Sequence, residues 1–126
     1  MATTTITRTR GAATAVVWTL SILSAAMFLF AGGSKLAGQA AMVQLFEAIG
    51  LGQWFRYLTG IIEVTGAALL LVPSLAVYGA VALAVTMVGA IITHVFVVGG
   101  SPLVPIVLLA ATSTIAYLRR PNLSNS

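Results

Sequence analysis

The sequence contains no cysteine and very few charged residues. Only 6% of its 126 residues are charged, whereas 60% are hydrophobic. The absence of cysteine excludes disulfides, thiolate metal sites and Cys-x-x-Cys redox chemistry within this chain. The single histidine, His94, excludes haem ligation by two histidines of one subunit. Because a water-soluble domain of this size has to cover its surface with polar groups, the composition predicts an integral membrane protein.

The apolar residues fall into four runs, at approximately residues 13–34, 55–73, 75–98 and 102–118. Each run is close to the ~20 residues that an α-helix needs to cross a bilayer. Pro73-Ser74 separates the second run from the third, and two glycines followed by Ser101-Pro102 separate the third from the fourth. We therefore expect an all-α, integral membrane four-helix bundle, in which residues 1–126 form a single domain.

The segment between the first two runs, approximately residues 38–49, has the pattern of a short amphipathic helix. Its apolar residues Met42, Leu45, Phe46 and Ile49 recur at helical spacing, and its polar residues lie elsewhere on the helical wheel. Such a helix lies in the membrane interface. Since this is the largest segment outside the four runs, we expect it to act as a lid or as a docking surface.

Basic residues at the two ends of the chain predict its orientation. Arg8 and Arg10 precede the first run, and Arg119 and Arg120 follow the last. An even number of spans puts both termini on one side, which the positive-inside rule makes cytoplasmic. The net charge of +4 therefore reflects topology and not nucleic-acid binding. A cleaved signal peptide is disfavoured, because the first run exceeds the ~7–15 residues of a signal core and lacks a small-x-small cleavage site.

Glu63 is the most informative residue, because it lies inside the second apolar run. An ionisable group at such a position costs roughly 2.5–3.5 kcal/mol on insertion scales, and it usually faces the bundle interior and marks a functional site. Helical rise places Glu63 about 10 Å below Arg56, and it places His94 about 7–8 Å below the outer surface. Lys35 closes the first run on that same face. We expect these four side chains to share the outer half of one bundle. We also expect Glu63 to contact a basic side chain or His94, because an unpaired carboxylate at that depth would be too costly.

Three of the runs carry a stripe of small and polar residues that includes an ionisable group. The stripes are Ser21, Ser24 or Ala25, Phe28, Gly32 and Lys35 in the first run, Arg56, Thr59 or Gly60, Glu63 and Ala67 in the second, and Ala82, Thr86, Ala90 and His94 in the third. Small residues let membrane helices approach closely, and polar residues belong in the interior of a bundle. These stripes predict a ligand-binding site made by Phe28, Gly32, Lys35, Arg56, Thr59, Glu63, Thr86, Ala90 and His94. If the protein is an enzyme, Glu63 and His94 are the candidate catalytic residues, and no metal site is expected.

Each of these ionisable residues also has a structural interpretation. Lys35 and Arg56 can extend their charged ends to the membrane surface while their stems stay in the apolar region. His94 can cap the C-terminal end of its helix, where positive charge is favoured. Glu63 can belong to a buried ion pair that fixes helix registry without chemistry. These alternatives remain open at the level of the sequence.

Several short motifs resemble the DoxX-like family. They are Phe28-Leu29-Phe30-Ala31-Gly32-Gly33-Ser34-Lys35-Leu36, Phe46-x-x-Ile49-Gly50, Leu58-Thr59-Gly60-x-x-Glu63-x-x-Gly66, Leu71-Val72-Pro73 and Gly89-Ala90-x-x-Thr93-His94. Their order and spacing cover nearly the whole chain. The resemblance implies a four-helix membrane bundle with the family's polar residues at Lys35, Glu63 and His94. It also implies association with respiratory-type or oxidative-stress complexes, one of which is a thiosulfate:quinone oxidoreductase.

Three functions are compatible with these observations. The first is a binding protein for a lipophilic small molecule, such as a quinone or another lipid, which serves a membrane or soluble redox partner. The second is a membrane-embedded enzyme, an isomerase, a cyclase or an epoxide-opening enzyme: a carboxylic acid in low dielectric holds its proton tightly and a histidine can relay protons. The third and least favoured is a small proton-coupled transporter. We expect a multi-pass protein of the bacterial inner (plasma) membrane, and homo-oligomerisation is compatible with the sequence.

Overall fold

The computed structural model describes residues 2–123, with side chains from residue 11 onward. This part of the chain contains helices and no strands, so the all-α fold class is confirmed. Its elements are α1 (Ala2–Ala37), α2 (Ala40–Ile49), α3 (Gln53–Leu70), α4 (Ala76–Thr93), the π-helical turn η1 (His94–Val98), α5 (Leu103–Arg119) and the 3₁₀ turn η2 (Arg120–Leu123).

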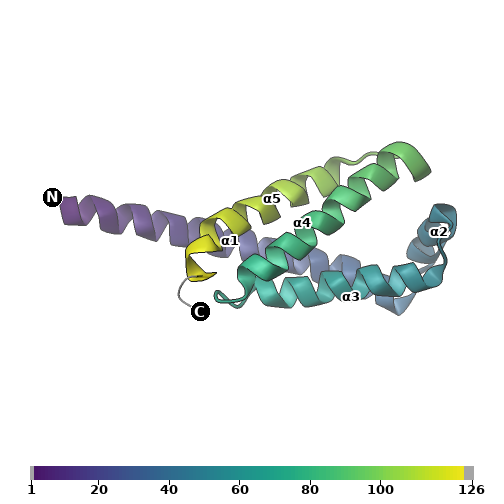
Figure 1. Ribbon diagram of the computed structural model, residues 1–126, viewed down its shortest axis with the longest axis horizontal. Helices are drawn as coiled ribbons and strands as arrows, with labels where there is room; N and C mark the ends of the chain where they lie inside the picture. The colour runs from purple at the N-terminus through teal and green to yellow at the C-terminus, as the bar shows by residue number, and fades with distance from the viewer. Residues whose placement is uncertain (1, 124–126) are drawn as a thin grey trace.

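The four long helices form a bundle in which each helix packs against two others. α1 lies against α3 and α5, and α4 also lies against α3 and α5. Figure 1 shows that the α4–α5 pair runs at an angle to the α1–α3 pair, and that the two pairs diverge toward the end where α2 lies. The first turns of α1 project beyond the bundle at the opposite end.

Three segments of the described chain are long and apolar enough to cross a membrane: Gly11–Ala37, Ala76–Val98 and Leu103–Leu123. α3 is not among them, because polar residues lower its mean hydropathy. It nevertheless has 18 residues, as α4 does. Its two charged side chains, Arg56 and Glu63, are buried inside the protein and do not face lipid. The protein is thus a helical membrane bundle, and the crossing of the bilayer by α3 stays a prediction.

The helix ends differ from the predicted spans mainly at the start of the chain. α1 begins at Ala2, whereas the first span was predicted from residue 13, and it ends at Ala37. The predicted third span is divided between α4 and the π-helical turn η1. The side chains of Arg8 and Arg10, which contribute to the predicted orientation, lie outside the part of the chain whose side chains are described.

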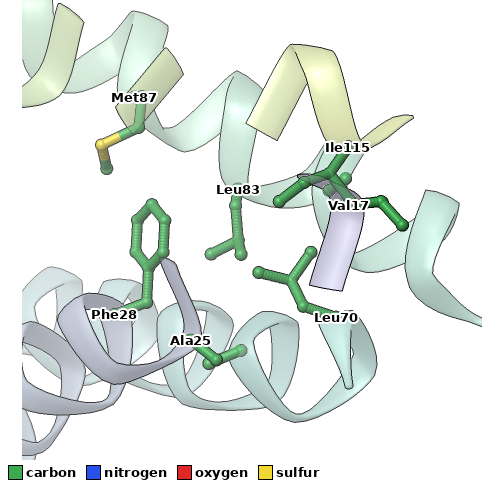
Figure 2. Packing of buried hydrophobic residues seen from close by; sticks show 9 residues of the cluster. Val17, Ala25, Phe28, Leu70, Leu83, Met87 and Ile115 are labelled. Atoms are coloured by element: carbon green, nitrogen blue, oxygen red, sulfur yellow. The ribbon is translucent and has the colours of Figure 1, made fainter. Parts of the chain in front are cut away.

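The core is built from apolar side chains of all four long helices. Phe28 of α1, Leu70 of α3, Leu83 of α4 and Ile115 of α5 are fully buried and converge between the helices (Figure 2). This core lies beside the stretch where the two helix pairs are closest, so the pairs stay together there and separate toward α2.

Glycines allow the closest backbone approaches within the bundle. A Cβ atom added at Gly32 of α1 would lie 2.9 Å from the carbonyl oxygen of Gly60 of α3. A Cβ atom added at Gly79 of α4 would lie 2.7 Å from the carbonyl oxygen of Gly66 of α3. Real Cβ contacts are longer than this, so neither position accepts a side chain without a shift of the helices. Small residues at helix contacts are the usual means of tight packing in membranes.

The predicted amphipathic helix is present as α2 and lies across the end of the bundle. Its residue Phe46 is buried, and the ring of Phe46 lies 5.8 Å from that of Phe55 on α3. The Nε2 atom of Gln53 donates a hydrogen bond of 3.1 Å to the carbonyl oxygen of Val43. Gly50 ends α2 at φ 84°, a left-handed conformation that favours glycine, and donates its N–H to the carbonyl of Phe46.

Candidate functional site

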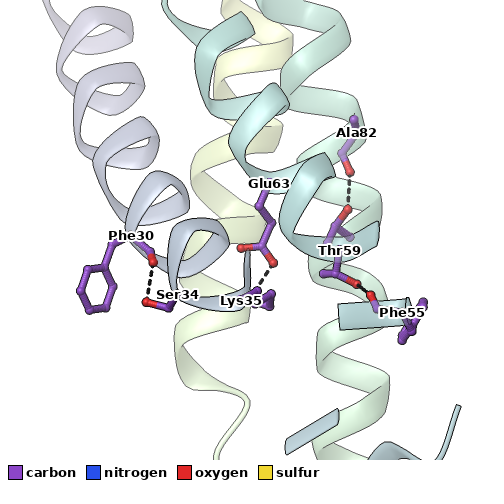
Figure 3. Close-up of polar contacts among 8 residues, drawn as sticks. Phe30, Ser34, Lys35, Phe55, Thr59, Glu63 and Ala82 are labelled. Atoms are coloured by element: carbon purple, nitrogen blue, oxygen red, sulfur yellow. Dashed lines mark hydrogen bonds and ion pairs between the residues drawn. The ribbon is translucent and has the colours of Figure 1, made fainter. Parts of the chain in front are cut away.

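An ion pair between Lys35 and Glu63 joins α1 to α3. The Nζ atom of Lys35, in the last turn of α1, lies 2.9 Å from the Oε1 atom of Glu63. The Lys35 and Glu63 side chains are 12% and 2% exposed, respectively. Figure 3 shows the two side chains pointing toward each other across the helix contact. The prediction that Glu63 contacts a basic side chain or His94 is therefore confirmed, with Lys35 as the partner.

The second oxygen of this carboxylate has a different environment. The Oε2 atom of Glu63 is buried and has no hydrogen-bond partner among the described residues. A buried polar atom without a partner costs about 1–3 kcal/mol, and more when it carries charge. This oxygen is therefore a hydrogen-bond acceptor for which the described residues supply no donor.

A cavity of about 860 Å³ lies between the two helix pairs, beneath α2, and Glu63 and Lys35 form part of its wall. Most of the lining is apolar. It comes from every helix of the bundle, with Phe28 on α1, Phe46 on α2, Leu58 on α3, Met87 on α4 and Leu108 on α5. A concave, mainly apolar hollow with a few polar groups is the usual form of a small-molecule site.

The hydroxyl groups of the threonines in the lining donate their hydrogen bonds within their own helices. The Oγ1 atoms of Thr59, Thr86 and Thr93 each donate a hydrogen bond of 2.8 Å to the carbonyl oxygen four residues earlier. Figure 3 shows this bond for Thr59 and the carbonyl of Phe55. The Lys35–Glu63 pair and His94 are therefore the groups best placed for polar interactions with a bound molecule.

His94 lines the cavity from the opposite helix pair, where α4 passes into the π-helical turn. Its Nδ1 atom lies 3.2 Å from the carbonyl oxygen of Gly99. Because a carbonyl oxygen only accepts, Nδ1 carries the proton in this bond, and the Nε2 atom of a neutral ring is left as an acceptor. The bond to Gly99 agrees with a role at the helix end. Single π-helical turns within α-helices are frequent at functional sites.

Seven of the nine residues predicted to bind ligand line this cavity: Phe28, Lys35, Thr59, Glu63, Thr86, Ala90 and His94. Gly32 and Arg56 do not line it. Gly32 lies at the close contact between α1 and α3, next to Glu63 but on the helix-packing side. Its small size serves the approach of the helices.

Arg56 is buried between the end of α1 and the start of α3. Its Nε atom donates a hydrogen bond of 2.7 Å to the Oε1 atom of Gln53, and its Nη1 atom donates to the carbonyl oxygen of Lys35. The guanidinium carbon lies 4.3 Å from the centre of the Tyr57 ring. These contacts show a side chain that holds the C-terminal end of α1 against α3, where helix carbonyls lack partners.

The predicted stripes agree with the structure to different degrees. On α1, Ser21, Ser24, Phe28 and Gly32 are all buried. On α4, the buried face consists of Ala76, Gly79, Ala80, Leu83 and Met87, which is offset around the helix from the predicted stripe. Ala82, at the start of that stripe, is exposed. Its later members face the cavity because the helix pairs diverge there.

The sequence interpretation missed the contribution of α5 to the cavity. Val104, Pro105 and Leu108 line it, as does Ser101 in the preceding loop. Nothing in the sequence distinguishes Val104 and Leu108 from apolar residues that face lipid. No group of three histidine, cysteine or acidic residues that could hold a metal ion occurs within the described residues.

The fold and the site define a small helical membrane protein with an ion pair in the wall of an apolar cavity. The sequence profile of the DoxX-like family matches residues 19–116. The chain belongs to this family, and the matched region contains Lys35, Glu63 and His94. Comparisons with curated proteins and with solved structures gave no match.

Proposed function

We propose that the protein binds a lipophilic small molecule in the cavity and serves as a membrane subunit of a redox or stress-response complex. The observation that carries this proposal is the buried carboxylate of Glu63, which has one oxygen paired with Lys35 and the other without a partner in the cavity wall. A ligand with a hydrogen-bond donor completes the bonding of that carboxylate. The apolar lining accepts the rest of the molecule.

The ion pair suits a quinone-like head group in both of its redox states. A quinone carbonyl can accept a hydrogen bond from the Lys35 ammonium, and a quinol hydroxyl can donate to Oε2 of Glu63. The cavity volume of about 860 Å³ falls within the range of small-molecule sites. Because the chain has no cysteine and one histidine, electrons would reach such a ligand from a partner protein.

Identification of co-purified lipids tests this proposal directly. The protein is purified in lipid nanodiscs, extracted with organic solvent and analysed by mass spectrometry for a stoichiometric small molecule. The extraction is repeated for Glu63→Gln and for Glu47→Gln, a matched change at an exposed glutamate of α2 outside the cavity. A hydrogen bond to a charged group contributes about 1.5–3 kcal/mol, so Glu63→Gln should weaken binding about 10- to 100-fold.

The control variant makes the result specific to the cavity. Glu47→Gln should retain the ligand at the level of the unmodified protein. Equal retention by both variants would contradict the proposal, and so would the absence of any small molecule from the unmodified protein together with no binding of added quinol.

A membrane-embedded acid–base enzyme is a second candidate, because Glu63 and His94 line the same cavity from opposite helix pairs. In a double-bond isomerisation, the Glu63 carboxylate would remove a proton from an allylic carbon, and a protonated His94 would deliver one to the far alkene carbon. The site would then return to its starting state by proton exchange between the two groups. Loss of a general acid or base lowers turnover about 10²–10⁴-fold.

The two candidates differ in what Glu63→Gln does. For a binding protein, the change weakens ligand retention and there is no chemical step to lose. For an enzyme, the variant folds and inserts but no longer converts its substrate. Comparison of terpenoid and sterol-like lipids in membranes with and without the active protein, by mass spectrometry and NMR, would reveal a rearranged product.

A further inference from the structure

A second hollow, which we call the flank groove, lies between α1 and α5. Its volume is about 350 Å³, and its walls are apolar side chains of residues 20–27 and 103–111 together with Ser24. Leu23 and Val107 in these walls are 61% and 56% exposed, so the groove opens on the outer surface of the bundle. In a membrane, this surface meets the hydrocarbon of the lipids.

The flank groove lies next to the cavity. Val104 and Leu108 line both hollows. On α1, the cavity wall includes Phe28 and Lys35, and the groove wall runs from Leu20 to Met27. Each of these stretches corresponds to about 10 Å of helix. The two hollows therefore lie end to end along α1, with the Lys35–Glu63 pair in the first and apolar walls in the second.

We propose that the flank groove holds the hydrocarbon tail of the molecule whose polar group binds at Lys35 and Glu63. The inference rests on the proposed function and adds the shape of the ligand: an amphiphile with one polar head and one apolar tail. The Lys35–Glu63 pair determines which end of the ligand enters the cavity. A polar head group would find almost only apolar side chains in the flank groove. The tail leaves the cavity past Val104 and Leu108 and reaches the bilayer between α1 and α5.

The tail gains little by transfer from lipid to the groove, because lipid hydrocarbon is as apolar as the groove walls. Its contribution is steric. A head group bound at Glu63 can carry a long tail only if the tail has room beyond the head group, and we propose that the flank groove next to the cavity provides that room. Filling the groove should therefore weaken the binding of long-tailed ligands and leave short ones unaffected.

Two phenols serve as probes, since a phenol hydroxyl can donate to Oε2 of Glu63. 4-Ethylphenol fits the cavity without a tail, and 4-nonylphenol carries a chain that would enter the groove. Their affinities are measured on the full chain in nanodiscs and are corrected for partition into lipid. Ala111→Trp fills the groove, and Ala110→Trp is the matched control, because Ala110 is exposed on the same helix and does not line the groove.

Ala111→Trp should weaken 4-nonylphenol binding by about tenfold or more, which corresponds to ~1.4 kcal/mol, and leave 4-ethylphenol binding unchanged. Ala110→Trp should change neither affinity. Leu23→Trp and its control Ile22→Trp, an exposed α1 position outside the groove, repeat the comparison from the other wall. Unchanged 4-nonylphenol binding in the folded groove variants would overturn the inference.

A photo-crosslinking measurement keeps the test independent of these variants. A 4-nonylphenol analogue with a diazirine at the tail tip should label peptides containing residues 20–27 and 103–111, and excess 4-ethylphenol should prevent the labelling. Labelling outside residues 20–27 and 103–111 would refute the inference. Groove labelling that 4-ethylphenol does not reduce would also refute it, because that result is expected for an acyl chain that binds the groove without a head group at Glu63. Failure of 4-ethylphenol to bind the unmodified protein would instead count against the proposed function, and this inference would fall with it.

Discussion

The ammonium of Lys35 lies 2.9 Å from the carboxylate of Glu63, so that the last turn of α1 is tied to the middle of α3 by opposite charges. This pair has two consequences. It lowers the cost of placing a carboxylate inside a membrane bundle. It also leaves the second carboxylate oxygen buried without a hydrogen-bond partner among the described residues, in a low-dielectric surrounding where a hydrogen bond is stronger than it would be in water.

Lys35→Met should destabilise the bundle strongly, because it leaves the Glu63 carboxylate buried without its partner. Breaking a buried pair in this way costs about 3–5 kcal/mol. The double variant Lys35→Met/Glu63→Met should recover most of that loss, since it removes both charges together. Unfolding by SDS titration in mixed micelles measures these differences. A single variant as stable as the unmodified protein would show that the pair is not coupled in the folded state.

Gly32→Ala and Gly33→Ala should differ sharply, although the two residues are neighbours. A Cβ atom at Gly32 would lie 2.9 Å from the Gly60 carbonyl oxygen, whereas a Cβ atom at Gly33 would meet nothing within 4 Å. Overpacking costs about 1–3 kcal/mol, whereas alanine for glycine in an open helix position stabilises by up to ~1 kcal/mol. The same SDS titration should therefore give opposite signs. Similar effects of the two changes would contradict the α1–α3 contact.

Arg56→Lys should lower stability without lowering ligand affinity. Lysine lacks the planar fork with which Arg56 reaches both Gln53 and the carbonyl oxygen of Lys35. Each lost charge-assisted hydrogen bond costs about 1.5–3 kcal/mol. Because Arg56 does not line the cavity, 4-ethylphenol should bind the folded variant normally. A stable variant with binding as weak as that of Glu63→Gln would place Arg56 in the ligand site.

The absence of cysteine makes single-cysteine labelling a clean measure of topology. Gln44→Cys on the exposed face of α2 and Ser74→Cys in the turn between α3 and α4 are both exposed positions. If α3 crosses the membrane, a maleimide that cannot cross membranes should label Gln44→Cys in intact cells or spheroplasts. Ser74→Cys should react only after the membrane is permeabilised. Equal labelling of the two positions from one side would show that α3 does not span.

The sequence predicted the helices and the ion-pair residues because membranes limit the alternatives. Apolar runs of the right length can form only helices, and an ionisable residue such as Glu63 has to turn inward. The placement of Lys35 and His94 near the same membrane face was predicted from the direction in which each span crosses the membrane. These predictions rest on local hydropathy and helical rise, and both quantities can be read from a single chain.

The role of Arg56 and the contribution of α5 could not be predicted in the same way. Whether Arg56 faces the cavity or the end of α1 depends on a few ångströms of helix position, which the sequence does not specify. Val104 and Leu108 resemble lipid-facing residues, since apolar side chains suit a bilayer and a cavity wall equally well. The stripe on α4 was offset because the divergence of the helix pairs is a property of the whole bundle.

The close contact between Gly66 and Gly79 lies near the end of the bundle from which the helix pairs diverge. From Gly79, α4 continues for about 22 Å to His94. A rotation of about 5° at the glycines would therefore move His94 by ~2 Å relative to Glu63, because displacement grows along the 1.5 Å-per-residue lever. The spacing of the polar groups in the cavity thus depends on a helix contact whose glycines do not line the cavity. A single methyl group added at Gly79 would lie 2.7 Å from the Gly66 carbonyl oxygen. It would change the distance between His94 and Glu63 by shifting α4, without contacting the cavity.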